Sequence, residues 1–307
     1  MIKNIIKKFF KKIHSVDELL SEIEKNKFLV GRLLSENLLN KVSKNINDYE
    51  FSIFSQWGED GILDFIIRKL HLKDGVFIEF GVDNYIESNT RFLLFKENWN
   101  GLVIDSCEKN VNQIQNSYYY WKYNILAKKF FINKNNINNI IADFLDQQCK
   151  KTLDLLSIDI DGNDYWILNN VEFEKFKPKI VVCEYNSLLG NKLSLTIPYK
   201  EEFNRENNDP KLKIYYGASI KAFVNLLNKK GYIFLGSNNN ANNLFFVAKE
   251  FEKIFDHQTV DSGYKKNKFK EFNNEDFNTA QKRLDKKQFF DLEKNQLVNI
   301  NYLDLND

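Results

Sequence analysis

Residues 76–81 constrain the fold of this chain more than any other segment. They read VFIEFG, an apolar run with Glu79 near its end and Gly81 at its close, and a second apolar run, LVID, ends in Asp105. A strand, a glycine turn, a helix and a second strand in this order build a Rossmann-like unit. The glycine lets the backbone approach a ligand, and the second acid accepts hydrogen bonds from two ribose hydroxyls. The sequence therefore predicts an adenosine-containing cofactor over Gly81, with Asp105 on its ribose.

The sequence of the loop after the first strand distinguishes between the possible cofactors. It reads GVDNY from Gly81 to Tyr85, and it lacks the G-x-G-x-x-G pattern on which a pyrophosphate lies at a helix N-terminus. S-adenosylmethionine (SAM) has no phosphate and is the predicted cofactor. Asn84 stands where a second glycine is common, and asparagine tolerates left-handed backbone. An NAD-dependent oxidoreductase remains the alternative, because the ribose acid alone would fit it too.

Composition excludes some classes of function. The net charge is +2, from 44 basic and 42 acidic residues, so no strong field for nucleic acid is expected. Cys107, Cys149 and Cys183 fall at no metal or disulfide spacing, which favours a cytoplasmic protein. No apolar run is long enough to predict a membrane span.

From residue 51 onward the sequence alternates between strand and helix patterns. We expect strands at 75–80, 101–105, 128–132, 154–159, 179–184, 231–235 and 243–248. We expect helices at 59–70, 88–97, 109–120, 136–148, 164–170 and 218–229. This alternation predicts an α/β, Rossmann-like fold whose mostly parallel sheet is covered on both faces. The connection at 236–243 is too short for a helical crossover, so the last strand should be antiparallel, as in the class I methyltransferase sheet.

Two extensions flank the predicted SAM-binding domain at 51–250. Residues 1–50 place apolar residues at helical spacing among lysines, and a capping box at Ser15 predicts the start of a second helix. Such a basic helix either packs on the domain or a second subunit, or lies on an anionic membrane. Residues 251–307 are polar and charged and are expected to form a C-terminal helical extension.

Six blocks in this order resemble the FkbM-type SAM-dependent methyltransferases, most closely members encoded with bacterial surface-polysaccharide biosynthesis. The blocks are SQWGED (55–60), FIEFGV (77–82), ESNT (87–90), NWNGLVID (98–105), LLSIDIDGNDYW (155–166) and VCEYN (182–186). The resemblance covers about residues 51–248. It implies methyl transfer to oxygen, commonly on a sugar.

Several polar residues near the strand ends are candidates for cofactor binding. The full set is Gln56, Glu79, Gly81, Tyr85, Ser88, Asn89, Thr90, Asp105, Ser106, Asn133 and Asp159. The resemblance implies that the segment with Gln56 covers the cofactor. Glu79 could anchor either the cofactor's amino group or a loop amide. Residues 88–90 open a helix, where capping is the alternative role, and Asn133 is the candidate for the adenine edge.

Acidic residues follow the fourth and fifth predicted strands. Ligands bind outside the carboxyl ends of strands in such sheets, so these side chains should converge beside the donor methyl. So many negative charges need compensation, and oxygen ligands favour Mg²⁺ or Mn²⁺. The candidate metal ligands are Asp159, Asp161, Glu184 and Asn186. Ordinary turn and cap chemistry is the alternative for part of this group.

Methyl transfer to a hydroxyl requires alignment of the reactants and removal of a proton. The candidate catalytic residues are Asp159, Asp161 and Asp164, with Asp164 as the base. Residues 215–219 and 237–243 are expected on the acceptor side of the cleft, and residues 190–210 as a lid.

The leading hypothesis is a SAM-dependent O-methyltransferase acting on a sugar hydroxyl, with a nucleotide-linked sugar for capsule or lipopolysaccharide as substrate. A catalytically silent SAM-fold scaffold subunit in glycan assembly is a further alternative. The expected partners are the small-molecule sugar substrate and a second copy of the chain, with a dimer as the default. Peripheral membrane contact through the N-terminal helix also stays open, and no nucleic acid is expected.

Overall fold

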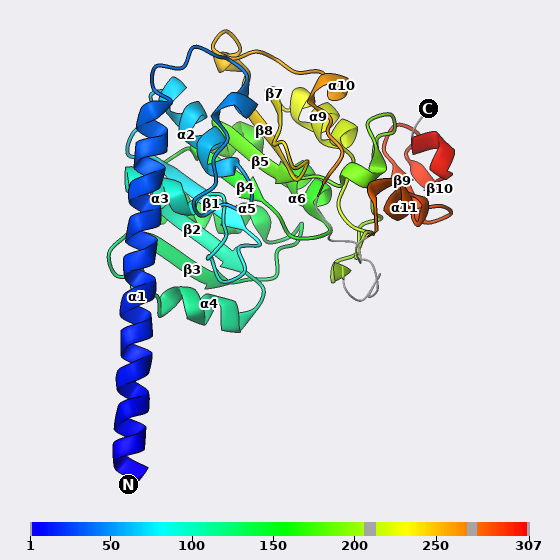
Figure 1. Ribbon diagram of the computed structural model, residues 1–307. Helices are drawn as coiled ribbons and strands as arrows, with labels where there is room; N and C mark the ends of the chain where they lie inside the picture. Colours follow the sequence, from blue (N-terminus) through cyan, green and yellow to red (C-terminus); the bar gives the residue numbers. More distant parts are fainter. Residues whose placement is uncertain (1, 206–212, 269–274, 306–307) are drawn as a thin grey trace.

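A seven-stranded sheet with the order β3-β2-β1-β4-β5-β8-β7 forms the centre of the computed structural model (Figure 1). The structure describes residues 2–205, 213–268 and 275–305. The strands are β1 (Val76–Phe80), β2 (Asn100–Asp105), β3 (Ile125–Lys129), β4 (Leu155–Ile158), β5 (Ile180–Glu184), β7 (Tyr232–Ser237) and β8 (Asn243–Ala248). Strands β1 to β5 pair in parallel, and β8 is antiparallel to both β5 and β7. The predicted fold class, with its antiparallel last strand, is confirmed.

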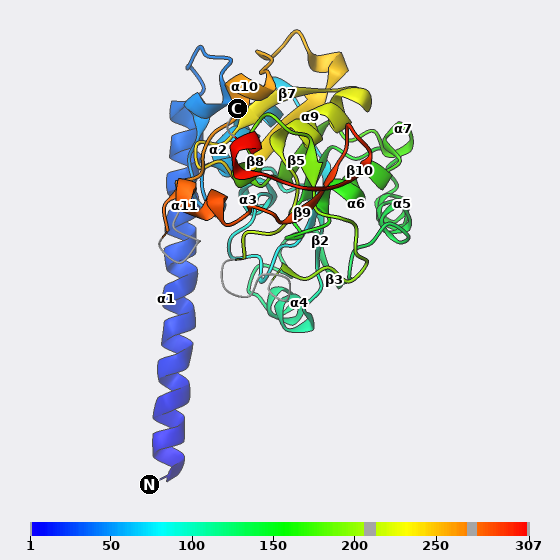
Figure 2. The same cartoon turned by 90° about the vertical axis from the view of Figure 1, so that its right-hand side faces the viewer.

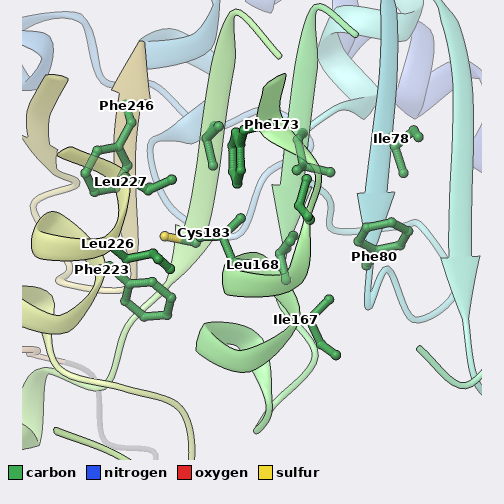
Figure 3. Packing of buried hydrophobic residues seen from close by; sticks show 14 of the residues in the cluster. Ile78, Phe80, Ile167, Leu168, Phe173, Cys183, Phe223, Leu226, Leu227 and Phe246 are labelled. Carbon is green, nitrogen blue, oxygen red and sulfur yellow. The ribbon is translucent and has the colours of Figure 1, made fainter. Parts of the chain in front are cut away.

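Helices cover both faces of this sheet because the strand residues alternate between two apolar cores. The helices of the domain are α2 (Glu59–Lys69), α3 (Arg91–Glu97), α4 (Glu108–Gln115), α5 (Ile137–Gln147), α6 (Asp164–Asn170), α7 (Phe173–Phe176) and α9 (Ile220–Lys229). Ile78 and Phe80 point to the core under α5, α6 and α9, part of which is drawn in Figure 3. Phe77 and Val103 point to the other core, under α2, α3 and α4. A sheet buried on both faces is typical of parallel α/β folds.

The N-terminal extension is one helix, α1 (Ile2–Asn37), followed by the short 3-10 helix η1 (Ile46–Tyr49). Figures 1 and 2 show α1 running along the body and projecting well beyond it. The expected second start at Ser15 is therefore wrong. The helical apolar spacing continues through Ser15 without a glycine or proline until Gly31, so nothing in the chain interrupts the helix.

The C-terminal extension is not purely helical, contrary to expectation. Strands β9 (Gln288–Asp291) and β10 (Gln296–Asn299) pair with each other, and β9 pairs with β6 (Leu195–Thr196) in a second sheet. The side chain of Asp291 accepts hydrogen bonds from two backbone N–H groups of the turn, those of Glu293 and Lys294. The short elements η2 (Ser187–Leu189), α11 (Phe277–Lys282) and η4 (Tyr302–Leu305) accompany this sheet, whereas η3 (Lys249–Phe251) and α10 (Val260–Gly263) follow β8. A separate apolar cluster that includes Leu195 and Phe289 holds the segment on the domain.

Three boundaries differ from the expected ones in ways that matter for the site. Strand β3 ends at Lys129, so the apolar residues 130–132 lie beyond it. Helix α3 begins at Arg91, which leaves 88–90 as a loop, and α4 ends at Gln115. Within the described ranges, no helix combines the length and apolar character needed to cross a membrane.

Candidate functional site

A cavity of about 880 Å³ opens at the carboxyl ends of the parallel strands. Its lining comprises Gln56, Gly81, Asp83, Ile104, Asp105, Ser106, Cys107, Asn110, Phe130, Phe131, Ile132, Asp159, Ile160, Asp161, Asn163, Glu184, Phe203, Asn204, Arg205 and Asn242. The ends of β1, β2, β4 and β5 and the segment after β3 all contribute to it. This is where ligands bind in sheets of this topology, and the volume suits a cofactor-sized molecule.

Gly81 brings the turn after β1 against β4. Its φ is +75°, and a Cβ there would lie 1.5 Å from the carbonyl oxygen of Asp159. The Gly81 N–H donates to the carbonyl oxygen of Ile104 at 2.9 Å. Only glycine meets both demands, so this position lets backbone form the cavity wall.

Asp105 lies at the end of β2 in the cavity, as expected, but most of its hydrogen-bonding capacity is in use. Its Oδ1 accepts from Cys107 N at 2.7 Å and from Asn110 Nδ2 at 3.2 Å, and its Oδ2 accepts from Asp83 N at 3.0 Å. A carboxylate has about four acceptor positions. One position is therefore left for a ribose hydroxyl, and a second becomes available if the Asn110 amide moves away.

Glu79 organises a loop instead of lining the cavity. Its carboxylate accepts from Ser88 Oγ at 2.8 Å, Asn89 N at 2.8 Å and Thr90 N at 3.1 Å, and also from Thr90 Oγ1. Burial raises the pKa of Glu79, while these hydrogen bonds oppose the rise. None of these four residues lines the cavity, and the Asn89 amide donates to Ser157 Oγ at 3.1 Å. Of the two roles open to Glu79, the structure shows the loop anchor.

Two further cofactor candidates lie outside the cavity lining. Tyr85 is fully buried, and its hydroxyl is 2.8 Å from Thr90 Oγ1, so it does not block the cavity. The Oδ1 of Asn133 accepts from Asn135 N and Asn136 N at the start of α5, which is a turn role. Ser106 does line the cavity beside Asp105.

Gln56 also lines the cavity, and buried carboxylates at the start of α2 hold its loop. The Oδ2 of Asp60 accepts from Ile53 N, Phe54 N and Ser55 N at 2.6–2.9 Å. Burial raises the pKa of Asp60 to about 6. Glu59 accepts from Trp57 N at 2.9 Å. These bonds hold the segment 53–57, from which Gln56 reaches the cavity.

Three of the four predicted metal ligands come together. Asp159, Asp161 and Glu184 each offer a carboxylate oxygen, and these atoms lie within 4.8 Å of one another. Glu184 is buried, Asp159 partly buried and Asp161 exposed. Burial, and after it repulsion by neighbouring acids such as Asp161, raises the pKa values of Asp159 and Glu184 well above the ordinary range. Glu184 Oε2 is buried and has no hydrogen-bond partner among the described residues.

The cation that faces this cluster is Arg205, which the sequence analysis missed. Its guanidinium forms an ion pair with Asp161 and lies 3.8 Å from the ring centre of Tyr216. Its charge lowers the pKa values of Asp159 and Glu184 against the effect of burial. Arg205 lies in a connecting segment with no local pattern, so only tertiary contact reveals its place.

Asp164 and Asn186 lie outside the cavity lining, and both bind backbone groups. Asp164 is buried below the cavity, and its oxygens accept from Ile160 N at 2.7 Å and Gly162 N at 2.8 Å. Burial raises its pKa to about 6, yet it does not line the cavity, so it shapes the 159–164 turn. Asn186 Oδ1 accepts from Leu188 N, and its amide donates to two carbonyl oxygens. Its side chain therefore holds the backbone that follows β5, and it does not line the cavity.

Aromatic side chains after β3 were also missed as site residues. Phe130 and Phe131 are 40% and 47% exposed, and with Ile132 they line the cavity. Their apolar run was interpreted as part of the strand. Exposed aromatic rings at a cavity rim offer a flat apolar surface for a ring of the ligand.

The expected acceptor side is formed only in part. Tyr215 donates to the carbonyl oxygen of Gln288, and residues 215–219 do not line the cavity. In the asparagine hairpin, Asn238 and Asn243 donate to Glu59 Oε1 at 2.6 and 3.0 Å, and only Asn242 lines the cavity. The expected lid at 190–210 lies partly outside the described residues.

Residues 115–234 match the family model of the methyltransferase FkbM domain. No curated protein matches the chain. A SAM-dependent methyltransferase from Clostridium acetobutylicum is similar, with a TM-score of 0.38 and 11% identity over 62% of this chain and 89% of that chain. A SAM-dependent methyltransferase from Aquifex aeolicus has a TM-score of 0.33 and 13% identity over 60% of this chain and 87% of that chain. The fibrillarin pre-rRNA processing protein of Methanococcus jannaschii has a TM-score of 0.37 and 11% identity over 68% and 86%.

Proposed function

From the match of residues 115–234 to the methyltransferase FkbM domain, we propose that this chain methylates a sugar hydroxyl. The observation that carries the proposal is the carboxylate pair Asp159 and Glu184 on the cavity wall, next to the Gly81 turn. A hydroxyl must lose its proton as the new bond to carbon forms, and a carboxylate within reach lowers that barrier.

Several features of the cavity support SAM as the cofactor. Asp105 has an acceptor position left for a ribose hydroxyl, and the rings of Phe130 and Phe131 offer a wall for adenine. The backbone at Gly81 admits close approach, and the acidic lining favours a ligand with positive charge. When bound, SAM supplies an activated methyl group on a sulfonium that leaves readily.

A divalent metal, Mg²⁺ or Mn²⁺, is part of the proposal. The oxygens of Asp159, Asp161 and Glu184 would hold it, and such ligands suit a hard cation. Glu184 Oε2, which is buried without a hydrogen-bond partner, supports a ligand at this place. Arg205 already pairs with Asp161, so the metal would compete with the guanidinium for that carboxylate.

The proposed acceptor is a nucleotide-linked sugar for capsule or lipopolysaccharide, methylated in the cytoplasm. Polar amides at the cavity suit hydroxyl groups, and they come from Gln56, Asn163 and Asn242. Asn163 Oδ1 is buried and has no hydrogen-bond partner among the described residues. Of the described residues that line the cavity, Arg205 is the single Lys or Arg, and it would face a phosphate of the acceptor.

Release of S-adenosylhomocysteine over a panel of nucleotide sugars tests the function, with Mn²⁺, with Mg²⁺ and with a chelator. We expect Asp159→Ala and Glu184→Ala to lower kcat by at least about 100-fold, since each removes a group beside the reacting oxygen. The control is Asp143→Ala, which changes an exposed acid on α5.

The outcomes separate the parts of the proposal. Turnover that persists in the presence of the chelator would exclude the proposed role of the metal. It would leave the proposed methyl transfer intact. Calorimetry with SAM and NAD checks the alternatives, because binding of NAD alone would support the oxidoreductase and binding of neither would support the scaffold. If S-adenosylhomocysteine is released but no sugar of the panel serves as the acceptor, only the general methyltransferase function would remain supported.

A further inference from the structure

Helix α1 exposes a broad apolar face to solvent. Seven large apolar side chains between residues 19 and 34 are 37–59% exposed. They are Leu19, Leu20, Ile23, Leu29, Val30, Leu33 and Leu34. We call this set the α1 stripe. A contiguous apolar surface of this kind on a folded protein marks an interaction site.

The stripe cannot turn inward, because specific contacts hold the opposite side of α1 on the body. Glu24 forms an ion pair with buried Arg91 at 2.9 Å, and Ser35 donates to Asp64 at 2.8 Å. Gly31 packs so closely that an added Cβ would lie 2.6 Å from the ring of Phe92. The rotation of α1 about its own axis is therefore set by three independent contacts.

The spacing of the stripe indicates what covers it. Along the helix, apolar residues recur at alternating intervals of four and three, with Lys27 the one exception. They are Ile2, Ile6, Phe9, Ile13, Val16, Leu20, Ile23, Val30 and Leu34. A heptad pattern sustained over this length is typical of a helix that packs against another long helix, and one lysine in such a seam is tolerated. Helix α1 itself, with 36 residues, provides such a partner in a second copy.

The charges along α1 indicate the relative orientation of the two helices. Residues 2–13 contain five lysines and no acid, whereas residues 17–24 contain Asp17, Glu18, Glu22 and Glu24 and no base. A parallel pair would place lysines against lysines, whereas an antiparallel pair centred near residue 14 would place residues 2–13 of one copy against residues 17–24 of the other. Both views show the N-terminal end of α1 projecting clear of the body (Figures 1 and 2).

We propose that two copies of this chain associate through antiparallel pairing of α1 in this staggered register, which covers Leu19, Leu20 and Ile23 of the α1 stripe. The two bodies then lie toward opposite ends of the helix pair, so each copy keeps its own cavity. The interface is separate from the proposed catalytic site.

Sedimentation velocity of the full chain over a range of concentrations tests the association. We expect the natural chain to be a dimer and the double variant Leu20→Glu/Ile23→Glu to be a monomer. The Kd for dimerisation of the variant should be at least about 100-fold weaker, because two charges would be buried in the interface between the helices. The matched control is Lys25→Gln, an exposed residue of α1 outside the stripe, which should leave the dimer intact. Unchanged thermal midpoints would show that the variants fold.

Salt tests the orientation. Raising NaCl from about 0.05 M to about 0.5 M screens charges, so it should weaken an antiparallel dimer and would strengthen a parallel one. A stronger dimer in high salt would overturn the antiparallel pairing.

Two results would overturn self-association itself. One is a natural chain that stays monomeric at about 100 μM, far above a typical Kd for a stable dimer. The other is a monomer that binds vesicles of phosphatidylglycerol and phosphatidylcholine and loses this binding in Leu20→Glu/Ile23→Glu, which would make the stripe a membrane-surface contact.

Discussion

At the scale of single residues, the carboxylates near the strand ends divide by what their oxygens contact. Glu79 and Asp164 are buried and accept hydrogen bonds from nearby loops, so their work is to hold backbone. Asp105, Asp159 and Glu184 face the cavity with acceptor capacity left over. The position of an acidic residue in the sequence does not reveal whether its carboxylate holds a loop or faces the cavity. The difference lies in whether loop N–H groups reach it before a ligand does.

Asp105 provides a direct test of cofactor binding. Replacing it with alanine would remove the charge-assisted hydrogen bond that we propose to the ribose, and it would release the N–H groups of Asp83 and Cys107. We expect binding of S-adenosylhomocysteine to weaken by about 10–100-fold in calorimetry, because such a bond contributes about 1.5–3 kcal/mol. Equal affinity of the variant and the natural chain would show that the ribose lies elsewhere. Asp143→Ala again serves as the control.

At the scale of elements, loops carry more of the site than the helices and strands do. The 88–90 loop, the 53–57 loop and the 159–164 turn are each tied to one buried carboxylate. Strand β3 ends early, and the freed apolar residues become the cavity rim. A strand pattern and a rim of exposed rings look alike along the chain, because both are short apolar runs.

Glu79 tests how much one carboxylate contributes to an element. Glu79→Ala leaves the buried groups of Ser88, Asn89 and Thr90 without their acceptor. We expect the free energy of unfolding to fall by about 2–4 kcal/mol, measured by chemical denaturation. The control Glu87→Ala changes an exposed neighbour and should cost less than about 0.5 kcal/mol. A similar small loss for both variants would contradict the anchoring role.

At the scale of the whole molecule, the described residues include more buried acids than buried bases, which should make stability depend on pH. Burial raises the pKa of Glu59, Glu79 and Glu184, and raises the pKa of Asp60 and Asp164 to about 6. In the window between their ordinary values and these raised values, the folded chain holds protons that the unfolded chain has released. Stability therefore falls as pH rises through the window.

We expect the thermal midpoint of the ligand-free protein to be higher at pH 5 than at pH 7.5. For Asp60, the rise from 3.8 to about 6 corresponds to about 3 kcal/mol across the window. Asp60→Asn keeps an oxygen for the three N–H groups and cannot titrate, so it should show a smaller rise on acidification. Calorimetric scans at both pH values measure this. A midpoint that is lower at pH 5 in the natural chain would contradict it.

The sequence by itself determined the class of the fold and the position of the site. Strand periodicity, Gly81 and Asp105 are local signals, and a parallel sheet brings the carboxyl ends of its strands together whatever the loops do. Asp159, Asp161 and Glu184 were therefore found in one place.

Only the tertiary structure decided which groups face the cavity. Arg205 comes from a segment without a pattern, and the C-terminal strands became visible only through pairing with β6. Backbone N–H groups that lie close in space donate hydrogen bonds to the side chains of Asn186, Asp164 and Glu79. Hydrogen-bond satisfaction depends on atoms a few ångströms apart in three dimensions, and spacing along a chain does not encode that proximity.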